Sequence, residues 1–208
     1  RIAPDHDNYG AADEPWLVDL PAMRHAVHTA CGAAGTRDLG YALANRIFQE
    51  TGRQVTEHPV FFLRVADSQA GHGVAIPRPS ESIKLDYEGE IVLVIGKEGR
   101  HVPRESALSM IGGFTLGNEG SVRDWLRHGT LNVTQGKNFN KSGSAGPWIV
   151  TSDDIDPRRP IQLTTRVNGA IRQDETTERL IWAFAELIRY ISMFTTLKPG
   201  DLILTGTP

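Results

Sequence analysis

The sequence predicts an α+β chain that is built mainly from β-strands, with a few helices. Short apolar runs rich in Val, Ile and Leu recur after residue 60, and turns containing Gly, Pro or Asn separate them. Sustained helical periodicity is clear in only one long segment, 178–194. The composition, 39% hydrophobic and 23% charged residues, is typical of a soluble globular protein. Strands are therefore expected to outnumber helices.

Two regions are expected along the chain. Residues 1–57 are assigned to an N-terminal helical and irregular region, and residues 58–208 to the domain in which the predicted strands gather. The chain begins at Arg1 rather than Met and stops at Pro208, directly after an apolar strand. We therefore expect the sequence to be part of a longer product, with the second domain truncated at its C-terminus.

The N-terminal region predicts two short helices. The first would carry an apolar face that consists of Leu20, Val27, Ala30 and Cys31. The second covers residues 41–50 and would end at the helix-stop signal of Gly52.

The first predicted strands lie between residues 60 and 96. Val60–Leu63 reads as a short buried strand, and the stretch 67–82 is rich in turn residues. Residues 84–96 alternate between polar and apolar at first and then become continuously apolar at Ile91–Ile95. That change is typical of a strand that enters a core.

Further strands follow in the second half of the chain. Residues 111–117, 148–150 and 202–204 are short apolar runs. Residues 161–171 predict a hairpin that turns on Asn168-Gly169, the strongest short-range hairpin signal.

The longest predicted helix covers residues 178–194. Its apolar stripe contains Leu180, Ile181, Phe184, Leu187, Ile188 and Ile191. Such a stripe indicates core packing far more often than a cofactor site.

Composition excludes several classes of function. The formal net charge of −3 and the pI of about 6.2 do not fit a nucleic-acid-binding protein. Cys31 is the only cysteine, so the chain can form neither an internal disulfide nor a thiolate zinc site. No run approaches the roughly 20 apolar residues of a membrane helix, and no signal peptide is visible. These features predict no membrane partner and a reducing, cytoplasmic location.

Three acidic residues alternate before the apolar run, at Asp86, Glu88 and Glu90. In one continuous strand their side chains would share a face, where like charges repel. A divalent cation would satisfy such a face if it is buried, since hard cations prefer carboxylate oxygens. An acidic, solvent-exposed edge strand is the alternative.

A fourth acidic residue, Glu119, follows the predicted strand 111–117 within a glycine-flanked turn. This position would allow it to meet the carboxylates of a neighbouring strand. Helix N-capping by Asn118 or Ser121 explains the same turn equally well.

Lys137 precedes Asn138-Phe139 in a polar run. It could anchor a substrate carboxylate or stabilise a developing enolate. A solvated surface lysine is the alternative, because that is the usual environment of lysine.

Four segments in order resemble the fumarylacetoacetate hydrolase family. They are Asp86–Lys97 (DYEGEIVLVIGK), Gly113–Trp125 (GFTLGNEGSVRDW), Gly136–Phe139 leading to Gly146-Pro147-Trp148, and Leu197–Pro208 (LKPGDLILTGTP). Their order and spacing agree with the family over about residues 58–208.

The resemblance implies a fold, a metal and a set of site residues. The implied fold is the mixed β-sandwich roll of the family's C-terminal domain, with 58–208 as a catalytic β-roll that assembles as a homodimer. The implied ligands of Mg²⁺, Mn²⁺ or Ca²⁺ are Glu88, Glu90 and Glu119. The family's catalytic arginine and lysine correspond to Arg123 and Lys137, and the implied substrate-binding residues are Arg64 and Thr207.

The sequence departs from the family pattern at three places. Glu119 stands where an aspartate is usual, and Arg64 where a lysine is common. The family's water-activating histidine on a lid near the N-terminus has no counterpart in residues 40–52. His58 and His72 lie near the first strand of the domain, but proximity in sequence assigns neither as a base.

The resemblance implies metal-dependent hydrolysis of a C–C bond in a small 2-oxo (diketo) acid, through a metal-stabilised enolate. The alternatives are an isomerase or decarboxylase of 2-hydroxydienoate or 2-oxo diacid intermediates of aromatic catabolism, and a catalytically silent fold that binds a 2-oxo acid. A charged interior cluster argues against the silent fold.

Overall fold

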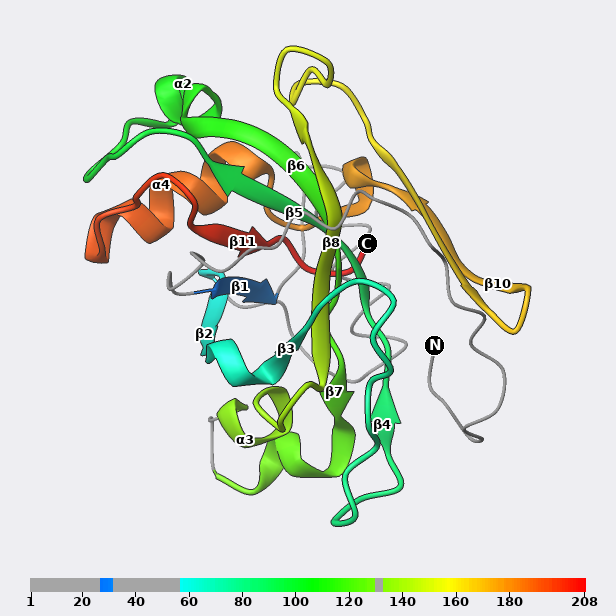
Figure 1. The fold of residues 1–208 in the computed structure, drawn as a ribbon. Helices are drawn as coiled ribbons and strands as arrows, with labels where there is room; N and C mark the ends of the chain where they lie inside the picture. Colours follow the sequence, from blue (N-terminus) through cyan, green and yellow to red (C-terminus); the bar gives the residue numbers. More distant parts are fainter. Residues whose placement is uncertain (1–26, 32–56, 130–132) are drawn as a thin grey trace.

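A curled, mixed β-sheet is the centre of the fold (Figure 1). The computed structural model describes residues 27–31, 57–129 and 133–208. Within them, seven strands form one sheet in the order β2-β1-β11-β5-β6-β8-β3. These strands are β1 (Val27–Cys31), β2 (Val60–Arg64), β3 (Gln69–Ala70), β5 (Gly89–Ile95), β6 (Ile111–Asn118), β8 (Gly143–Thr151) and β11 (Leu202–Leu204). The pairs β1–β11 and β3–β8 are parallel, and the other pairs are antiparallel.

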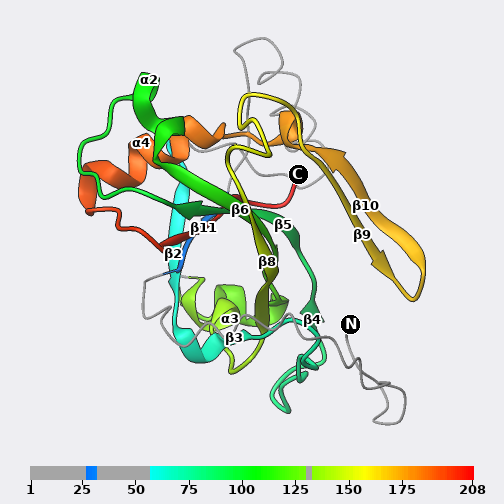
Figure 2. The ribbon, with the colours of Figure 1, turned by 45° about the horizontal axis from the view of Figure 1, so that its top comes forward.

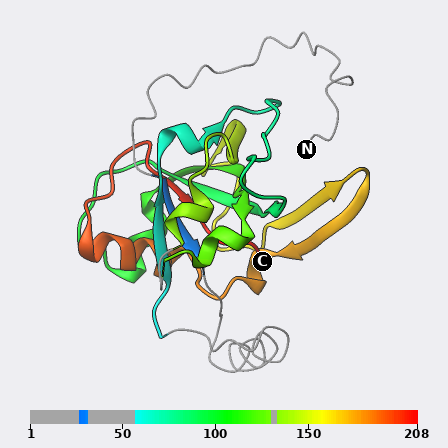
Figure 3. The ribbon, with the colours of Figure 1, turned by 90° about the horizontal axis from the view of Figure 1, so that it is seen from below.

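Two short strand pairs flank the sheet. Strand β4 (Leu85–Asp86) pairs with β7 (Ser121–Val122), and β9 (Gln162–Val167) pairs with β10 (Ala170–Thr176). The β9–β10 hairpin projects to one side of the molecule (Figures 2 and 3). It turns at Asn168 and Gly169, whose φ angles of 52° and 81° are both positive, as a two-residue hairpin turn requires.

Helices are short and few in the described part of the chain. The α-helices are α2 (Arg104–Ala107), α3 (Thr134–Lys137) and α4 (Phe184–Phe194). Four 3₁₀ turns accompany them: η1 (Ala66–Ser68), η2 (Leu108–Met110), η3 (Arg123–Arg127) and η4 (Thr177–Arg179). Helices α2 and α4 contact each other (Figure 1). None of the helices in the described ranges is long and apolar enough to cross a membrane.

Strand β5 is buried along its whole length and carries apolar side chains on both faces. On one face Ile91, Leu93 and Ile95 pack in the main core with residues of α4 such as Ile188. On the other face Val92 and Val94 pack against Leu202 and Leu204 of β11. Apolar side chains are therefore buried on both faces of the sheet at its centre.

The structure confirms the predicted α+β class and most of the predicted strands. The hairpin forms at the predicted turn. Strand β2 is only partly buried, because Val60 and Leu63 are exposed while Phe62 and Arg64 are not.

Two helix predictions need correction, the one that included residues 27–31 and the one over 178–194. The apolar face predicted through Val27, Ala30 and Cys31 belongs to no helix, because 27–31 is strand β1. Hydrogen bonding to β2 and β11 on its two sides overrides the local spacing. The predicted helix over 41–50 lies outside the described residues.

The helix predicted over 178–194 begins only at Phe184. Leu180 and Ala183 have extended backbone angles, with ψ of 137° and 152°. Leu180 and Ile181 are nevertheless buried. The apolar stripe therefore marks the core correctly, although its first part approaches the core as extended chain.

Candidate metal centre

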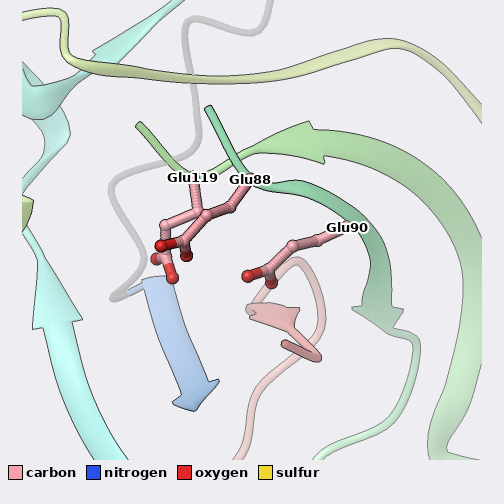
Figure 4. A group of neighbouring side chains, drawn as sticks. All are labelled: Glu88, Glu90 and Glu119. Atoms are coloured by element: carbon pink, nitrogen blue, oxygen red, sulfur yellow. The ribbon is translucent and has the colours of Figure 1, made fainter. Parts of the chain in front are cut away.

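Three glutamates from two neighbouring strands meet inside the roll (Figure 4). Glu90 lies on β5, Glu88 directly precedes that strand, and Glu119 directly follows β6. Each offers a carboxylate oxygen within 4.8 Å of the others, and their exposed fractions are 1%, 6% and 1%. The antiparallel pairing that sets Gly89 opposite Asn118 brings the three together, and the Glu119 amide donates to the Glu88 carbonyl at 2.8 Å.

The predicted alternation of three acidic residues on one strand holds only in part. The chain leaves the ladder between β4 and β5, so Asp86 pairs with Ser121 on a separate short strand. Its carboxylate is directed to Arg123 at the half-exposed rim rather than into the cluster. The third acidic group of the cluster is therefore Glu119, and the acidic edge-strand alternative does not apply to the buried Glu88 and Glu90.

Glu90 is the most constrained member of the cluster. Its Oε2 accepts a hydrogen bond from the Gly206 amide at 2.9 Å, whereas its buried Oε1 has no hydrogen-bond partner among the described residues. Burial raises the pKa of Glu90 well above its usual value, and repulsion from Glu119 and Glu88 adds to this effect. An unsatisfied carboxylate oxygen directed at two other carboxylates is a position that a cation would satisfy.

Lys137 is buried beside the glutamates rather than solvated at the surface. It is 3% exposed, and its Nζ lies 2.8 Å from Glu88 Oε2 and 3.1 Å from Glu119 Oε2. The same Nζ stands 5.2 Å from the centre of the Phe62 ring. Lys137 ends the short helix α3, so the polar run that the sequence showed is folded inward onto the cluster.

Arg64 is a buried cation that lies beside Glu119. It is 2% exposed and donates to the Gly120 carbonyl at 3.1 Å and to Ser142 Oγ at 2.8 Å, while its Nη1 lies 3.9 Å from Glu119 Oε1. Burial lowers the pKa of Arg64, although the nearby glutamates oppose this effect. A Cβ at Gly143 would lie only 2.6 Å from the guanidinium, so a side chain there would displace Arg64 from this position.

Arg123 bridges the rim and the buried cluster. Its side chain is 41% exposed; Nε and Nη2 lie 2.8 and 2.7 Å from Asp86 Oδ2, and Nη1 lies 2.5 Å from Glu88 Oε1. Burial lowers the pKa of Arg123, but attraction to Glu88 and the bond to Asp86 outweigh it and raise the pKa overall. Arg123 is thus the partly exposed cation of the site.

Two polar neighbours of Glu119 hold Glu88 rather than cap a helix. Ser121 Oγ donates to Glu88 Oε1 at 2.9 Å, and Asn118 Oδ1 accepts from the Glu88 amide at 3.1 Å. The sequence placed both residues beside Glu119 but did not reveal this role, which depends on the pairing of β5 with β6.

Thr207 stands beside the backbone that links Glu88 and Glu90. Its hydroxyl donates to the Gly89 carbonyl at 2.8 Å and accepts from the Gln173 side chain. By contrast, His58 stacks on Tyr190 of α4, and His72 is exposed next to Gly146.

The donor set fits a divalent cation. Three carboxylates supply hard oxygen ligands, and Glu90 contributes an oxygen that accepts no hydrogen bond from the part of the chain that the structure describes. Of the seven predicted site residues, six gather within one network: Glu88, Glu90, Glu119, Lys137, Arg123 and Arg64. Thr207 adjoins that network through Gly89.

A family model described as fumarylacetoacetate (FAA) hydrolase C-terminal matches residues 33–208. The chain belongs to this family. The resemblance that its four motifs suggested is therefore confirmed, and so is the fold class that it implied.

Curated relatives from the family share about a third of their residues with the chain. The mitochondrial oxaloacetate tautomerase Fahd2a of Rattus norvegicus is 36% identical over 160 residues, which is 77% of this chain and 51% of that protein. The maleylpyruvate hydrolase of Aquipseudomonas alcaligenes is 35% identical over 180 residues, 83% of this chain and 60% of that protein. The chain thus spans roughly half the length of the first of these relatives.

Solved structures of the family share the fold. The 5-carboxymethyl-2-hydroxymuconate delta-isomerase of Mycobacterium smegmatis superposes with a TM-score of 0.74 at 33% identity, over 89% of this chain and 68% of that one. The fumarylpyruvate hydrolase of Pseudomonas aeruginosa, solved with Mn²⁺ and pyruvate, gives 0.71 at 30% identity, over 88% and 78%. Relatives of this chain are therefore hydrolases, isomerases and tautomerases that act on small acids.

Proposed function

We propose that this chain carries the metal centre of an enzyme that hydrolyses a C–C bond in a small 2-oxo (diketo) acid. Glu88, Glu90 and Glu119 would hold Mg²⁺, with Mn²⁺ or Ca²⁺ as alternatives, since oxygen ligands suit all three. The observation that carries the proposal is the buried triad of carboxylates beside the ammonium of Lys137. The Mn²⁺ and pyruvate in the related fumarylpyruvate hydrolase structure support it.

When bound, the cation would supply a Lewis acid for the 2-oxo group of the substrate. Lys137 would act as the catalytic cation of the chain itself. Its ammonium is buried, so its field on a nearby substrate oxygen is screened less than it would be in water. It would stabilise negative charge on the enolate oxygen as that charge develops.

Arg123 would orient the substrate at the mouth of the site. Its planar guanidinium suits a carboxylate, and 41% of its side chain is accessible. Asp86 holds that guanidinium in place from the outer side. Arg64 and Thr207 remain the proposed substrate-binding residues; Arg64 would act from the buried wall beside Glu119, and Thr207 from beside Gly89.

Tautomerisation is the second candidate, and a related isomerase or decarboxylase reaction would use the same charges. Hydrolysis needs a base that activates water, and residues 33–56, where the family match begins, contain no histidine. Tautomerisation needs only the transfer of a proton within the substrate. The oxaloacetate tautomerases among the relatives support this candidate, as the maleylpyruvate hydrolase supports the first.

The test follows the ultraviolet absorbance of an acylpyruvate with Mg²⁺, for the parent chain and for Glu119→Ala. We expect metal-dependent decay in the parent and its loss in the variant, with Glu98→Ala, an exposed glutamate, as the matched control. Product analysis then separates C–C hydrolysis from loss of carbon dioxide. No decay in the parent contradicts hydrolysis of this substrate class, and oxaloacetate and hydroxydienoates would be assayed next.

A catalytically silent fold that binds a 2-oxo acid would behave differently in the same assay. It would bind the cation but turn over none of these acids.

The assembly we propose is a homodimer, which sedimentation would test. The cytoplasmic location, favoured by the single cysteine, is also a proposal, and the mitochondrial names of several relatives make fractionation of cells its test.

A further inference from the structure

The β9–β10 hairpin reaches the metal-binding strand at Gly89, the residue between two of the glutamates. The Gly89 amide donates to Gln173 Oε1 at 2.9 Å, and the Gly89 carbonyl accepts from Thr207 Oγ1 at 2.8 Å. Gln173 Nε2 in turn donates to Thr207 Oγ1. The three residues therefore form a closed ring of hydrogen bonds, the Gly89 ring, which satisfies both polar groups of the Gly89 backbone.

A β-bulge directs Gln173 into this ring. The pairing of β10 with β9 shifts register between Ile171 and Gln173. Gln173 is half-buried, whereas its neighbours Arg172 and Asp174 are exposed. Bulges of this kind redirect a side chain and are frequent beside active sites.

The hairpin and the strand approach closely at the same point. A Cβ placed on Gly89 would lie 2.1 Å from Thr165 Oγ1 of β9 and 3.0 Å from Gln173 Oε1. The contact thus favours a residue without a Cβ, because a side chain at position 89 would displace Thr165 or Gln173. The backbone between Glu88 and Glu90 is therefore held by the pairing of β5 with β6 and by the Gly89 ring.

We propose that Gln173 is a positioning residue for the metal centre and acts through the Gly89 ring. This inference rests on the proposed function, since it assumes that Glu88 and Glu90 bind a divalent cation. Gln173 accepts from the Gly89 N–H and so holds the peptide group that joins Glu88 to Gly89, and Thr207 donates to the Gly89 carbonyl and so holds the peptide group that joins Gly89 to Glu90. Thr207 has a single hydroxyl proton, and it donates this proton to the Gly89 carbonyl. In this proposal Thr207 therefore also helps to position Glu88 and Glu90, through the Gly89 backbone.

The test measures Mn²⁺ affinity by titration calorimetry for Gln173→Ala, Thr207→Val and the double variant. Each single change is expected to weaken Mn²⁺ binding about 10–100-fold, the range typical of residues that orient metal ligands. The double variant should lose little more than either single variant, because one change already opens the ring. Thr207→Ser keeps the hydroxyl and should recover most of the affinity.

The matched control is Asp174→Ala on the same strand. Asp174 Oδ1 accepts from Gln162 Nε2 and Thr164 Oγ1, each at 2.8 Å, so this change weakens bonds within the hairpin but leaves the Gly89 ring intact. Thermal unfolding without metal shows whether each variant is folded. Because Gln173 and Thr207 contribute to one ring, Thr207→Val tests the proposal even if Gln173→Ala fails to fold.

The outcomes separate this inference from the proposed function. If the parent chain binds no Mn²⁺, both are overturned. If the parent binds Mn²⁺ and Gln173→Ala binds it equally well, only the role of Gln173 is overturned. Equal losses in Gln173→Ala and Asp174→Ala would assign the effect to hairpin stability and would also overturn that role.

Discussion

The two faces of strand β5 bury different kinds of side chain. On one face Ile91, Leu93 and Ile95 pack in the main core under α4. On the other face the apolar pair Val92 and Val94 gives way to the buried carboxylate of Glu90. Both faces are shielded from water, but only the second face buries a charged group, the carboxylate of Glu90.

The two kinds of side chain differ in their free energy of burial. Burying one large apolar side chain contributes about 1.5–3 kcal/mol to the free energy of unfolding. Removing a carboxylate from water without full compensation costs several kcal/mol. The apolar face therefore contributes stability, whereas burying the carboxylates costs stability, and the positive charges of Lys137, Arg123 and Arg64 offset that cost.

The largest effect is expected for Lys137→Met in metal-free buffer. The variant leaves the buried Glu88 and Glu119 without the ammonium that bonds both. We expect a loss of about 3–5 kcal/mol in the free energy of unfolding, as for other broken buried ion pairs. Urea denaturation measures the loss, and added Mn²⁺ should recover part of it.

Lys97→Met, at an exposed lysine, is the control for this variant. If Lys137→Met is no less stable than that control, the ammonium does not compensate the carboxylate face, and the comparison between the faces fails.

The next largest effect is expected on the apolar face. Leu93→Ala removes a fully buried side chain and should lower the free energy of unfolding by about 2–5 kcal/mol. The Mn²⁺ affinity of the folded protein should not change, because Leu93 points away from the glutamates. Urea denaturation and calorimetry give the two values, with the partly exposed Ile149→Ala as control. A parallel loss of Mn²⁺ affinity would show that the faces are not independent.

The smallest change in stability, with the opposite sign, is expected for Glu90→Gln. Removing the charge ends the cost of burying it and relieves repulsion from Glu119 and Glu88, so metal-free stability should rise by about 1 kcal/mol. Mn²⁺ affinity should fall by more than about 10-fold, since a direct ligand is altered. Denaturation without metal and calorimetry with Mn²⁺ test both signs, and the exposed Glu98→Gln is the control. A variant that is less stable without metal would contradict the account of the carboxylate face.

The sequence predicted features that depend on neighbours along the chain. The Asn168-Gly169 turn determined the hairpin, and the stripe from Leu180 to Ile191 identified core residues correctly. The glutamates were found because two of them alternate at the entrance to an apolar strand, and Glu119 because a glycine-flanked acid follows the next strand. Local pattern and family resemblance agreed at these positions.

Features that depend on pairing between segments far apart in the sequence could not be predicted from local sequence patterns. Strand β1 forms because β2 and β11 bond to it, and no local spacing signals that. Asp86 lies outside the glutamate cluster because β4 pairs with β7 and does not continue into β5. Nothing near Gln173 in the sequence indicates that a bulge will direct it to Gly89.

The place of β11 in the sheet has a kinetic consequence. This strand lies between β1 and β5, and Val27 near one end of the described chain faces Leu202 near the other. Closing so long a loop makes folding slow, because chain entropy is lost before the contacts that repay it form. The amide of Gly206, which holds Glu90, reaches its place only when β11 has entered the sheet. A cation should therefore bind after the rate-limiting step of folding, so that it slows unfolding and leaves the folding rate unchanged.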